Sequence, residues 1–413
     1  MASKQRRGPK YFPKPPVSAE FLLKDLETSV ATFTTDSAAS ADDIKICNVK
    51  AVASYSWIDT PTPTILVPGS PRVWANKHIK RVPKDSGVQY VDRNSREMGD
   101  HSSHLPLFAA IDCLHENFGY NEHDFITDRN CLRKLLRYIR CSYNDDDFRI
   151  NIDMLQKTCL FSRCEENTTE NLTAFRGFGH EYERAATKAP HGCERTSGHH
   201  RILSYDFGGL KVLLRCTVDA CTESEIDDDD LFLASFNALS IRSRGSAISQ
   251  SYDLAPSPMS GLTVKITSPR SLIPQSDIIE IKTRSVRKDL DWDEIYPQLY
   301  LSQTGYLYVA RHDYGAFQPA EKIKLNGPDM KPYIEHAEET ICKLKALLDA
   351  ILKAVRKEGS GVPLSLVSLG GQLALYKRKE GTGKPLGEKI TSKFELVPPE
   401  HSTQVTPNDA VER

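Results

Sequence analysis

Alternation of apolar and charged side chains marks the stretch Ser276-Asp-Ile-Ile-Glu-Ile-Lys-Thr-Arg284. In a strand, side chains two residues apart lie on the same face, so Glu280 and Lys282 share one face while Ile279 and Ile281 share the other. The pattern therefore predicts a strand with isoleucines on one side and an acid and a base on the other.

A second predicted strand, Val212-Leu-Leu-Arg-Cys-Thr-Val-Asp219, is mostly apolar and ends in an acid. An acid at the end of one strand and Glu-x-Lys on a neighbour form the core pattern of metal-dependent nucleases. Carboxylates hold Mg²⁺ or Mn²⁺, the cation lowers the pKa of a water, and a lysine places or activates that water beside a phosphate. Glu-x-Lys alone is a weak signal, because charged side chains also alternate on solvated strand faces.

Helical spacing of apolar residues predicts two amphipathic helices. The first covers Arg129–Arg140, with Asp128 placed to cap its N-terminus, and the second covers Ile341–Val355. The polar side of the first helix is basic, a face that either binds phosphate or contacts water. Its basic residues are Arg133, Lys134, Arg137 and Arg140.

Shorter patterns predict the remaining elements. We expect strands between Ile44 and Val67, a strand pair at Phe148–Met154 and Thr158–Phe161, a helix beginning within Phe175–Glu183, a helix over Trp292–Thr304, a strand at Tyr306–Arg311, and a hairpin from Leu364 to Tyr376 that turns at Gly370-Gly371.

Composition divides the chain into one domain and two tails. Residues 1–20 are basic and proline-rich and residues 379–413 are charged and rich in Pro and Gly, so both predict disordered tails. Residues 21–378 are expected to form a single domain. A Ser-rich and acidic stretch at about 223–275 predicts an insertion with a short helix of its own, because a bare loop of that length is improbable.

Charge and cysteine content narrow the class of protein. The formal net charge of the 413 residues is −1, so any nucleic-acid surface must be a local patch. No run of about eighteen apolar residues occurs, which predicts an intracellular protein that does not span a membrane. The ten cysteines form no Cys-x-x-Cys pair, as expected of free thiols. A zinc site at His191, Cys193, His199 and His200 is less favoured than a polar loop that happens to hold histidines.

Several short motifs occur in an order that resembles the Rai/DXO-type RNA decapping nucleases, in particular a fungal branch often labelled geranylgeranyl pyrophosphate synthetase. The resemblance covers roughly Phe21 to Tyr376. Its motifs are similar to Ile126-Thr-Asp-Arg-Asn-Cys-Leu-Arg-Lys-Leu-Leu136, Gly179-His-Glu-Tyr-Glu183, Thr217-Val-Asp219, Glu280-Ile-Lys282, and Ser302-Gln-Thr304 with the turn at Asp313-Tyr-Gly315.

The resemblance implies a fold and a function. The fold is mixed α/β, with two packed β-sheets, flanking helices and a PD-(D/E)XK nuclease-like core. The function is metal-dependent hydrolysis at the 5′ end of RNA, either decapping or release of pyrophosphate, with 5′–3′ exoribonuclease activity as an extension. Mg²⁺ or Mn²⁺ is the implied cofactor, the nucleus (besides the cytoplasm) the implied location, and a 5′–3′ exoribonuclease an implied partner.

The same resemblance assigns roles to individual residues. The implied metal ligands are Glu183, Asp219 and Glu280, and Lys282 joins them as a catalytic residue. Arg129 is the implied contact to the 5′ phosphate or to RNA. Gln303 is the other implied RNA contact.

Thr217 departs from the family pattern, which has a glutamate at this position. A hydroxyl is a poorer ligand for a hard cation than a carboxylate, so this change weakens the expected metal site. The alternative function is therefore a catalytically weakened pseudoenzyme that binds RNA 5′ ends or a partner exonuclease.

A prenyl diphosphate synthase, which the branch's common label suggests, does not fit the sequence. Such enzymes need two Asp-Asp-x-x-Asp clusters on helices. Neither Asp145-Asp-Asp147 nor Asp227–Asp230 supplies the acid at the fifth position, and the strand-rich pattern disagrees with an all-helical fold.

Overall fold

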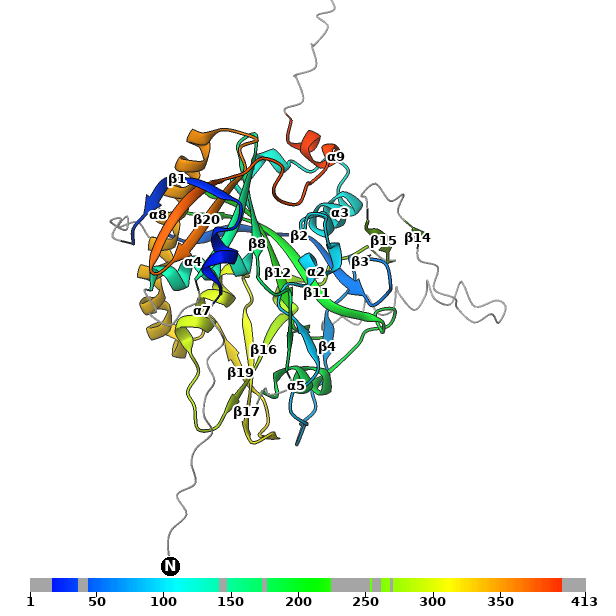
Figure 1. The fold of residues 1–413 in the computed structure, drawn as a ribbon. Coiled ribbons are helices and arrows are strands. Elements are labelled where there is room, and N and C mark those ends of the chain that lie inside the picture. Colours follow the sequence, from blue (N-terminus) through cyan, green and yellow to red (C-terminus); the bar gives the residue numbers. More distant parts are fainter. Residues whose placement is uncertain are drawn as a thin grey trace, which may run out of the picture.

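The computed structural model describes residues 17–35, 44–140, 147–172, 177–223, 253–254, 261–267 and 270–395. Strands of this part build two large sheets, and helices pack against both (Figure 1). The prediction of a mixed α/β fold with two sheets and flanking helices is confirmed. The helices are α1 (Ala19–Leu23), α2 (Arg93–Met98), α3 (Leu105–Leu114), α4 (Arg129–Ile139), α5 (Gly179–Ala186), α7 (Trp292–Leu301), α8 (Lys331–Glu358) and α9 (Glu388–Thr391).

The larger sheet has twelve strands in the described residues. In spatial order they are β1 (Leu26–Phe33), β21 (Gln372–Arg378), β20 (Leu364–Leu369), β7 (Phe148–Leu155), β8 (Thr158–Cys164), β6 (Phe125–Asp128), β12 (Leu210–Val218), β11 (Thr196–Phe207), β2 (Ile46–Ile58), β3 (Thr64–Val67), β15 (Thr263–Ile266) and β14 (Asp253–Leu254). The sheet is mixed, because β12 runs parallel to β6 and antiparallel to β11.

The smaller sheet carries the predicted Glu-x-Lys strand. Its order is β10 (Thr187–Lys188), β4 (Arg72–Trp74), β13 (Ala220–Cys221), β16 (Ile278–Ser285), β17 (Tyr306–Asp313) and β18 (Ala316–Phe317), with β19 (Glu321–Lys324) also on β17. Parallel strands β16 and β17 are joined through α7. A separate pair consists of β5 (Val88–Tyr90) and β9 (Thr169–Asn171).

Asp219 lies where the chain passes from one sheet to the other. Strand β12 of the larger sheet ends at Val218, and β13 of the smaller sheet begins at Ala220. The acid at the end of the predicted strand therefore stands at the junction of the two sheets, next to β16.

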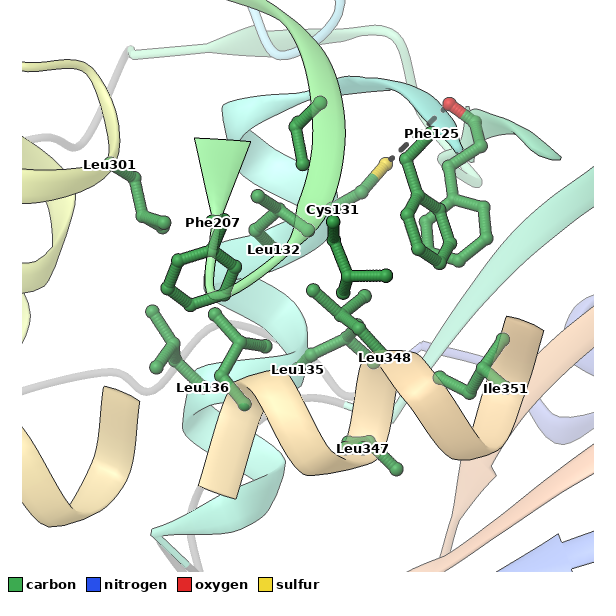
Figure 2. Packing of buried hydrophobic residues seen from close by; sticks show 14 of the residues in the cluster. Phe125, Cys131, Leu132, Leu135, Leu136, Phe207, Leu301, Leu347, Leu348 and Ile351 are labelled. Atoms are coloured by element: carbon green, nitrogen blue, oxygen red, sulfur yellow. Dashed lines mark hydrogen bonds between the residues drawn. The ribbon is translucent and has the colours of Figure 1, made fainter. Parts of the chain in front are cut away.

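Helices α4 and α8 cover one face of the larger sheet. Figure 2 shows how the leucines of α4 meet the apolar side chains of α8 (Leu132, Leu135, Leu136; Leu347, Leu348, Ile351). Each is at most 5% exposed, and full burial of a leucine side chain stabilises a fold by roughly 1.5–3 kcal/mol. This core fixes the position of α4, whose first residue, Arg129, reaches the candidate site.

The smaller sheet is also covered on both faces. Ile295 and Leu299 of α7 pack on Leu307 and Val309 of β17. On the opposite face, side chains of α5 pack against Ile279 and Ile281 (Tyr182, Ala186). The predicted division of β16 into an isoleucine face and a Glu-x-Lys face is thus confirmed.

Several boundaries differ from the prediction. Helix α8 begins at Lys331, ten residues before the first apolar position of the predicted helix. Its apolar stripe extends to Ile334 and Ala337, which pack on the core, but most other side chains of these first turns are exposed and polar. The hairpin of β20 and β21 is confirmed, and both turn glycines, Gly370 and Gly371, have positive φ (58° and 80°), which two-residue hairpin turns require.

The predicted disordered tail from residue 379 is wrong for its first part. Helix α9 follows the hairpin, and Ile390 and Phe394 are 1% and 0% exposed. The Phe394 ring lies 6.0 Å from that of Phe108 in α3. Two apolar side chains in a charged stretch give too weak a pattern to show this packing. Residues 396–413, and residues 1–16 of the other tail, lie outside the described part.

Two further predictions need correction. Residues 263–266, expected within an insertion, form β15, which pairs in parallel with β3 in the larger sheet. The short helix expected there falls outside the described residues. His199 and His200 lie in β11 and are buried, so they do not belong to a polar loop.

Candidate nuclease site

Asp219 is held against β16 by the main chain. Its Oδ2 accepts a hydrogen bond of 2.8 Å from the amide of Ile281, between Glu280 and Lys282 in the sequence. The register of β13 on β16 sets this contact, because Ala220 pairs with Ile279. The predicted meeting of Asp219 with the Glu-x-Lys strand is therefore present in the structure.

Glu280 is the most heavily engaged acid of the site and is 3% exposed. Its Oε1 accepts hydrogen bonds from the Lys282 ammonium and from the side-chain amide of Gln298 on α7. Its Oε2 lies 3.5 Å from Nη1 of Arg129 at the start of α4. Two cations and an amide thus hold this carboxylate in one position.

These cations also hold Glu280 in its charged form. Burial alone would raise the pKa of Glu280, but the charges of Lys282 and Arg129 lower it to about 2. Burial would lower the pKa of Lys282, and Glu280 and Asp219 raise it instead. At neutral pH the pair is therefore ionised on both sides.

Asp219 and Glu183 show the opposite shift. Burial and the negative charge of Glu280 raise the pKa of Asp219 to about 6. Burial and then Asp219 raise the pKa of Glu183 well above its ordinary value, and Glu280 and Asp85 add to this effect. The acids of the site repel one another strongly enough that they do not ionise independently.

Helix α5 presents Glu183 to this cluster. The first residue of α5, Gly179, lies beside β16: a Cβ there would be in ordinary contact with Oγ1 of Thr283, at 3.5 Å. Glu181, the other acid of the motif, pairs with Arg184 on its own helix. Of the two acids, Glu183 is therefore the one that joins Asp219 and Glu280.

Arg129 lies at the inner end of the site, 7% exposed. Besides Glu280, it contacts Oγ of Ser302 at 2.9 Å and the carbonyl oxygen of Thr217 at 3.5 Å. The predicted role of Arg129 as a phosphate contact stays a prediction. In the structure its guanidinium neutralises Glu280.

Gln303 does not reach the carboxylates. Its side-chain amide donates to the carbonyl oxygen of Tyr300 at 2.6 Å. The backbone carbonyl oxygen of Gln303 accepts a hydrogen bond of 2.9 Å from the side-chain amide of Gln275. Gln298, inside α7 and five residues earlier in the sequence, contacts Glu280 instead. The sequence offers one signal for it: a polar residue between apolar positions of α7 that turns out to be 5% exposed.

Asp85 is a second residue that the sequence did not single out. It is 3% exposed, and its Oδ1 accepts from the amide of Glu181 at 3.0 Å. A single acid in a loop between short strands carries no pattern that would mark it.

The expected N-cap of α4 is only half right. Asp128 is the N-cap residue, but its side chain makes no capping hydrogen bond. It binds Nε and Nη2 of the buried Arg215 at 2.6 and 2.9 Å. A buried guanidinium needs a carboxylate partner more than a helix end needs a cap, because an unpaired buried charge is costly.

The donor chemistry of the site suits a divalent cation, but its present arrangement does not form a ligand group. Hard cations prefer carboxylates, and a cation would relieve the repulsion among Glu183, Asp219 and Glu280. In the described part of the chain, however, no group of three or more His, Cys, Asp or Glu side chains is arranged to hold a metal ion, at the acids or at the predicted zinc residues. Thr217 is exposed at the end of β12 and adds no carboxylate.

Comparisons with known proteins give a family and a fold. Residues 31–368 match the model of a family described as a domain of unknown function (DUF8563). No curated protein sequence matches the chain. None of the helices in the described residues has the length and apolar character needed to cross a bilayer.

Several solved structures similar to this chain are of Rai1 proteins. Scheffersomyces stipitis Rai1 in complex with (3′-NADP)⁺ and calcium ion has a TM-score of 0.58 at 12% identity, covering 88% of this chain and 99% of that one. S. pombe Rai1 in complex with 3′-FADP has a TM-score of 0.55 at 11% identity, covering 84% and 99%. Candida albicans Rai1 in complex with pU5-Mn²⁺ has a TM-score of 0.52 at 11% identity, covering 89% and 99%. The chain therefore has a Rai/DXO-type fold, as its motifs predict.

Proposed function

The chain belongs to the family described as a domain of unknown function (DUF8563), and we propose that it is a hydrolase acting on the 5′ end of RNA. One observation carries the proposal: Asp219, Glu280, Lys282 and Glu183 gather on one strand junction of a Rai/DXO-type fold. Each of these positions matches the motif that the sequence predicts, although the motifs lie far apart along the chain.

The ligands of the similar structures support this class of substrate. Those Rai1 proteins are described in complex with pU5-Mn²⁺, 3′-FADP, or (3′-NADP)⁺ and calcium ion. These ligands share a phosphate-bearing nucleotide, and two of the complexes include a divalent cation. Their chemistry agrees with a site in which carboxylates and a lysine lie side by side.

We infer that Glu183, Asp219 and Glu280 would hold Mg²⁺ or Mn²⁺. Such a cation supplies charge that polarises a phosphoryl oxygen and makes a nearby water more acidic. Lys282, one-third exposed, is placed to orient the attacking water or the phosphate. Arg129 and Gln298 keep Glu280 fixed while the charge on the phosphate changes, as preorganised groups do in phosphoryl transfer. Water attacking the α-phosphorus of a 5′-triphosphate end would break the bond from that phosphorus to the α,β-bridging oxygen, so that pyrophosphate leaves and the RNA keeps a 5′-monophosphate.

A second candidate function is recognition of RNA 5′ ends without turnover. The exposed Thr217 and the lack of a ready ligand group in the described residues favour it. Lys282 forms an ion pair with Glu280, and a metal cation would have to compete with Lys282 for this carboxylate. In this case the site binds the phosphate through Lys282, and the acids are remnants of catalysis.

Product release separates the two candidates. Purified protein is incubated with 5′-triphosphate, NAD-capped and unmethylated-cap RNAs in Mg²⁺ or Mn²⁺, beside Glu280→Ala and Thr217→Glu. Release of pyrophosphate or a cap fragment by wild type and its loss in Glu280→Ala support the hydrolase. Inactive wild type with activity gained in Thr217→Glu supports the binding protein. Equal release by wild type and Glu280→Ala would sink both.

A nuclear location and a 5′–3′ exoribonuclease partner belong to the same proposal. They rest on the family resemblance alone. Co-purification of the tagged chain from nuclear and cytoplasmic fractions tests both at once.

A further inference from the structure

A row of four arginines on α4 leads away from the candidate site. Arg129, Arg133, Arg137 and Arg140 follow one another at intervals of one helical turn, over about 16 Å of helix. We call these residues the arginine row. Arg129 contacts Glu280 at its inner end, and the other three converge on one carboxylate, Glu294 of α7.

The contacts with Glu294 are numerous. Arg133 donates to it at 3.2 Å, Arg137 donates from Nε and Nη2 at 3.1–3.2 Å, and Arg140 donates through Nη2. Nε of Arg133 is buried and finds no hydrogen-bond partner among the described residues. Four guanidiniums thus share two direct carboxylate partners, Glu280 and Glu294.

The row is accessible. The side chains of Arg133, Arg137 and Glu294 are 25%, 33% and 24% exposed, against 8% for Arg129. Arg137 and Arg140 line a cavity of about 490 Å³ between α4, α7 and α8. Three carboxylates line the same cavity, those of Glu294, Asp291 and Asp293. Asp291 accepts a hydrogen bond of 3.3 Å from the amide of Glu294, and Asp293 lies 3.3 Å from His336.

A stable helix contact does not need this arrangement. One arginine satisfies one carboxylate with a bidentate pair, and additional guanidiniums beside it repel one another. The repulsion is visible at Arg133, where burial and the charges of Arg129 and Arg137 lower the pKa to about 10. Guanidinium groups bind phosphate as readily as carboxylate, through paired N–H donors, and three of them surround one pair of oxygens here.

We propose that the outer arginine row, Arg133, Arg137 and Arg140, is a second phosphate subsite in which Glu294 holds the place of the ligand. This inference rests on the proposed function, since its natural occupant is a phosphate of the RNA chain whose 5′ end lies at Glu280 and Asp219. When that phosphate binds, the three arginines exchange their ion pairs with Glu294 for contacts with the phosphate. The same chemistry also accepts free pyrophosphate, the product of the proposed reaction.

Binding of short 5′-phosphorylated RNAs tests the proposal by fluorescence anisotropy at several salt concentrations. The long RNA has about ten nucleotides, within the usual footprint of a single-strand groove, and the short one is a dinucleotide. Arg137→Gln should weaken the long RNA roughly tenfold and reduce its salt slope by about 0.7, one phosphate contact. The dinucleotide, which reaches only the inner site, should bind unchanged.

Glu294→Gln should change the affinity for the long RNA in the opposite direction. Removing the resident carboxylate should tighten the long RNA several-fold, although the variant unfolds at lower temperature. Lys134→Gln is the matched control, because Lys134 lies on the same helix but pairs with Glu165, away from the row. It should leave RNA affinity unchanged.

The remaining outcomes separate the ideas. If Arg137→Gln and Glu294→Gln lower stability but leave the affinity for the long RNA unchanged, the arginine row serves only to hold α4 against α7. The inference is then wrong. If Glu294→Gln tightens inorganic pyrophosphate alone, a free product and not the chain is the ligand, which supports the subsite but corrects its occupant. If wild type binds neither RNA, the proposed function fails together with this inference.

Discussion

Charge at the candidate site is set by pairs of individual side chains. Glu280 is kept ionised by Lys282 and Arg129, while Asp219 and Glu183 are pushed toward protonation by burial and by each other. Residues of one chemical type therefore carry different charges within one cluster. Such separation of pKa values is typical of functional sites.

Replacement of Glu183 by glutamine should stabilise the protein at neutral pH in the absence of metal. The folded state raises the pKa of this acid, so its charge opposes folding once the pH exceeds the pKa of the unfolded chain. Below about pH 4 both states are protonated and the gain should vanish. Thermal unfolding at pH 8 and pH 4 measures the difference.

Glu181→Gln is the control for this comparison, because Glu181 lies on the same helix turn and pairs with Arg184. It should not stabilise the protein at either pH. An equal loss of stability in Glu183→Gln at both pH values would contradict the prediction. It would show that Glu183 makes ordinary favourable contacts and is not repelled by the charge of Asp219.

The site residues could be predicted because their motif pairs them on one strand face. Period-two alternation gave the shared face of Glu280 and Lys282 correctly. Gln298 and Asp85 could not be found this way, because one comes from a helix and the other from a loop, and only the tertiary fold brings them near the acids. The family motif Ser302-Gln-Thr304 implies that Gln303 contacts RNA in the site, but its side-chain amide donates to the carbonyl oxygen of Tyr300.

Helix α4 shows how one element joins the core to the site. Its leucines pack on α8 (Figure 2). Its first residue, Arg129, contacts Glu280, and Asp128 just before it pairs with Arg215 of β12. The ion pair ties the start of the helix to the strand that leads to Asp219. Loss of the pair should therefore disturb both the fold and the site.

Asp128 predicts a pH dependence of stability with a definite sign. Burial would raise the pKa of Asp128, but the charge and hydrogen bonds of Arg215 lower it to about 2. A depressed pKa stabilises the fold above the unfolded value near 3.8, and that contribution, about 2 kcal/mol, disappears as the pH falls through about 2. Urea unfolding between pH 6 and pH 2 measures it.

Asp128→Asn should cost about 3–5 kcal/mol at pH 7, because it leaves Arg215 buried without a counter-charge. Asp349→Asn breaks a partly exposed i, i+4 pair with Lys345 on α8 and should cost less than about 0.5 kcal/mol. Similar small losses in both variants would mean that water or another group reaches Arg215.

Elements with clear periodicity were predicted well and those without it were not. Strands β12 and β16 and helix α4 follow their patterns to within about two residues. At the beginning of α8 the apolar stripe is reduced to Ile334 and Ala337 among exposed polar residues, and β15 has only four residues inside a long polar stretch, so neither gives a clear sequence pattern. For these segments the larger sheet and the core supply the order that local sequence lacks.

The two sheets and their covering helices make one continuous body through Asp219 (Figure 1). The C-terminal segment adds to it, since Phe394 and Ile390 close the core beside Phe108 and Tyr120. The net charge of the chain is only −1, yet the arginine row places several positive charges together, next to the acids of the candidate site. Composition alone cannot reveal such a pattern.

Truncation tests the packed role of residues 379–395. A chain ending at Glu395 should keep wild-type stability, whereas one ending at Arg378 exposes the Phe108 side of the core and should lose several kcal/mol. Phe394→Ala alone should cost about 3–5 kcal/mol, as for other buried aromatic residues. Chemical unfolding of the three chains gives the comparison, and no loss on truncation to Arg378 would contradict the packing of α9.

Discrimination between 5′-phosphorylated and 5′-hydroxyl RNA of the same sequence tests the central claim most directly, because both candidate functions require it. With Mn²⁺ present, wild type should prefer the phosphorylated RNA by about tenfold or more, and Lys282→Gln should lose most of that preference, since a charge-assisted contact contributes roughly 1.5–3 kcal/mol. Lys134→Gln should keep it. Equal affinity of wild type for the two RNAs would contradict the assignment of this site to RNA 5′ ends.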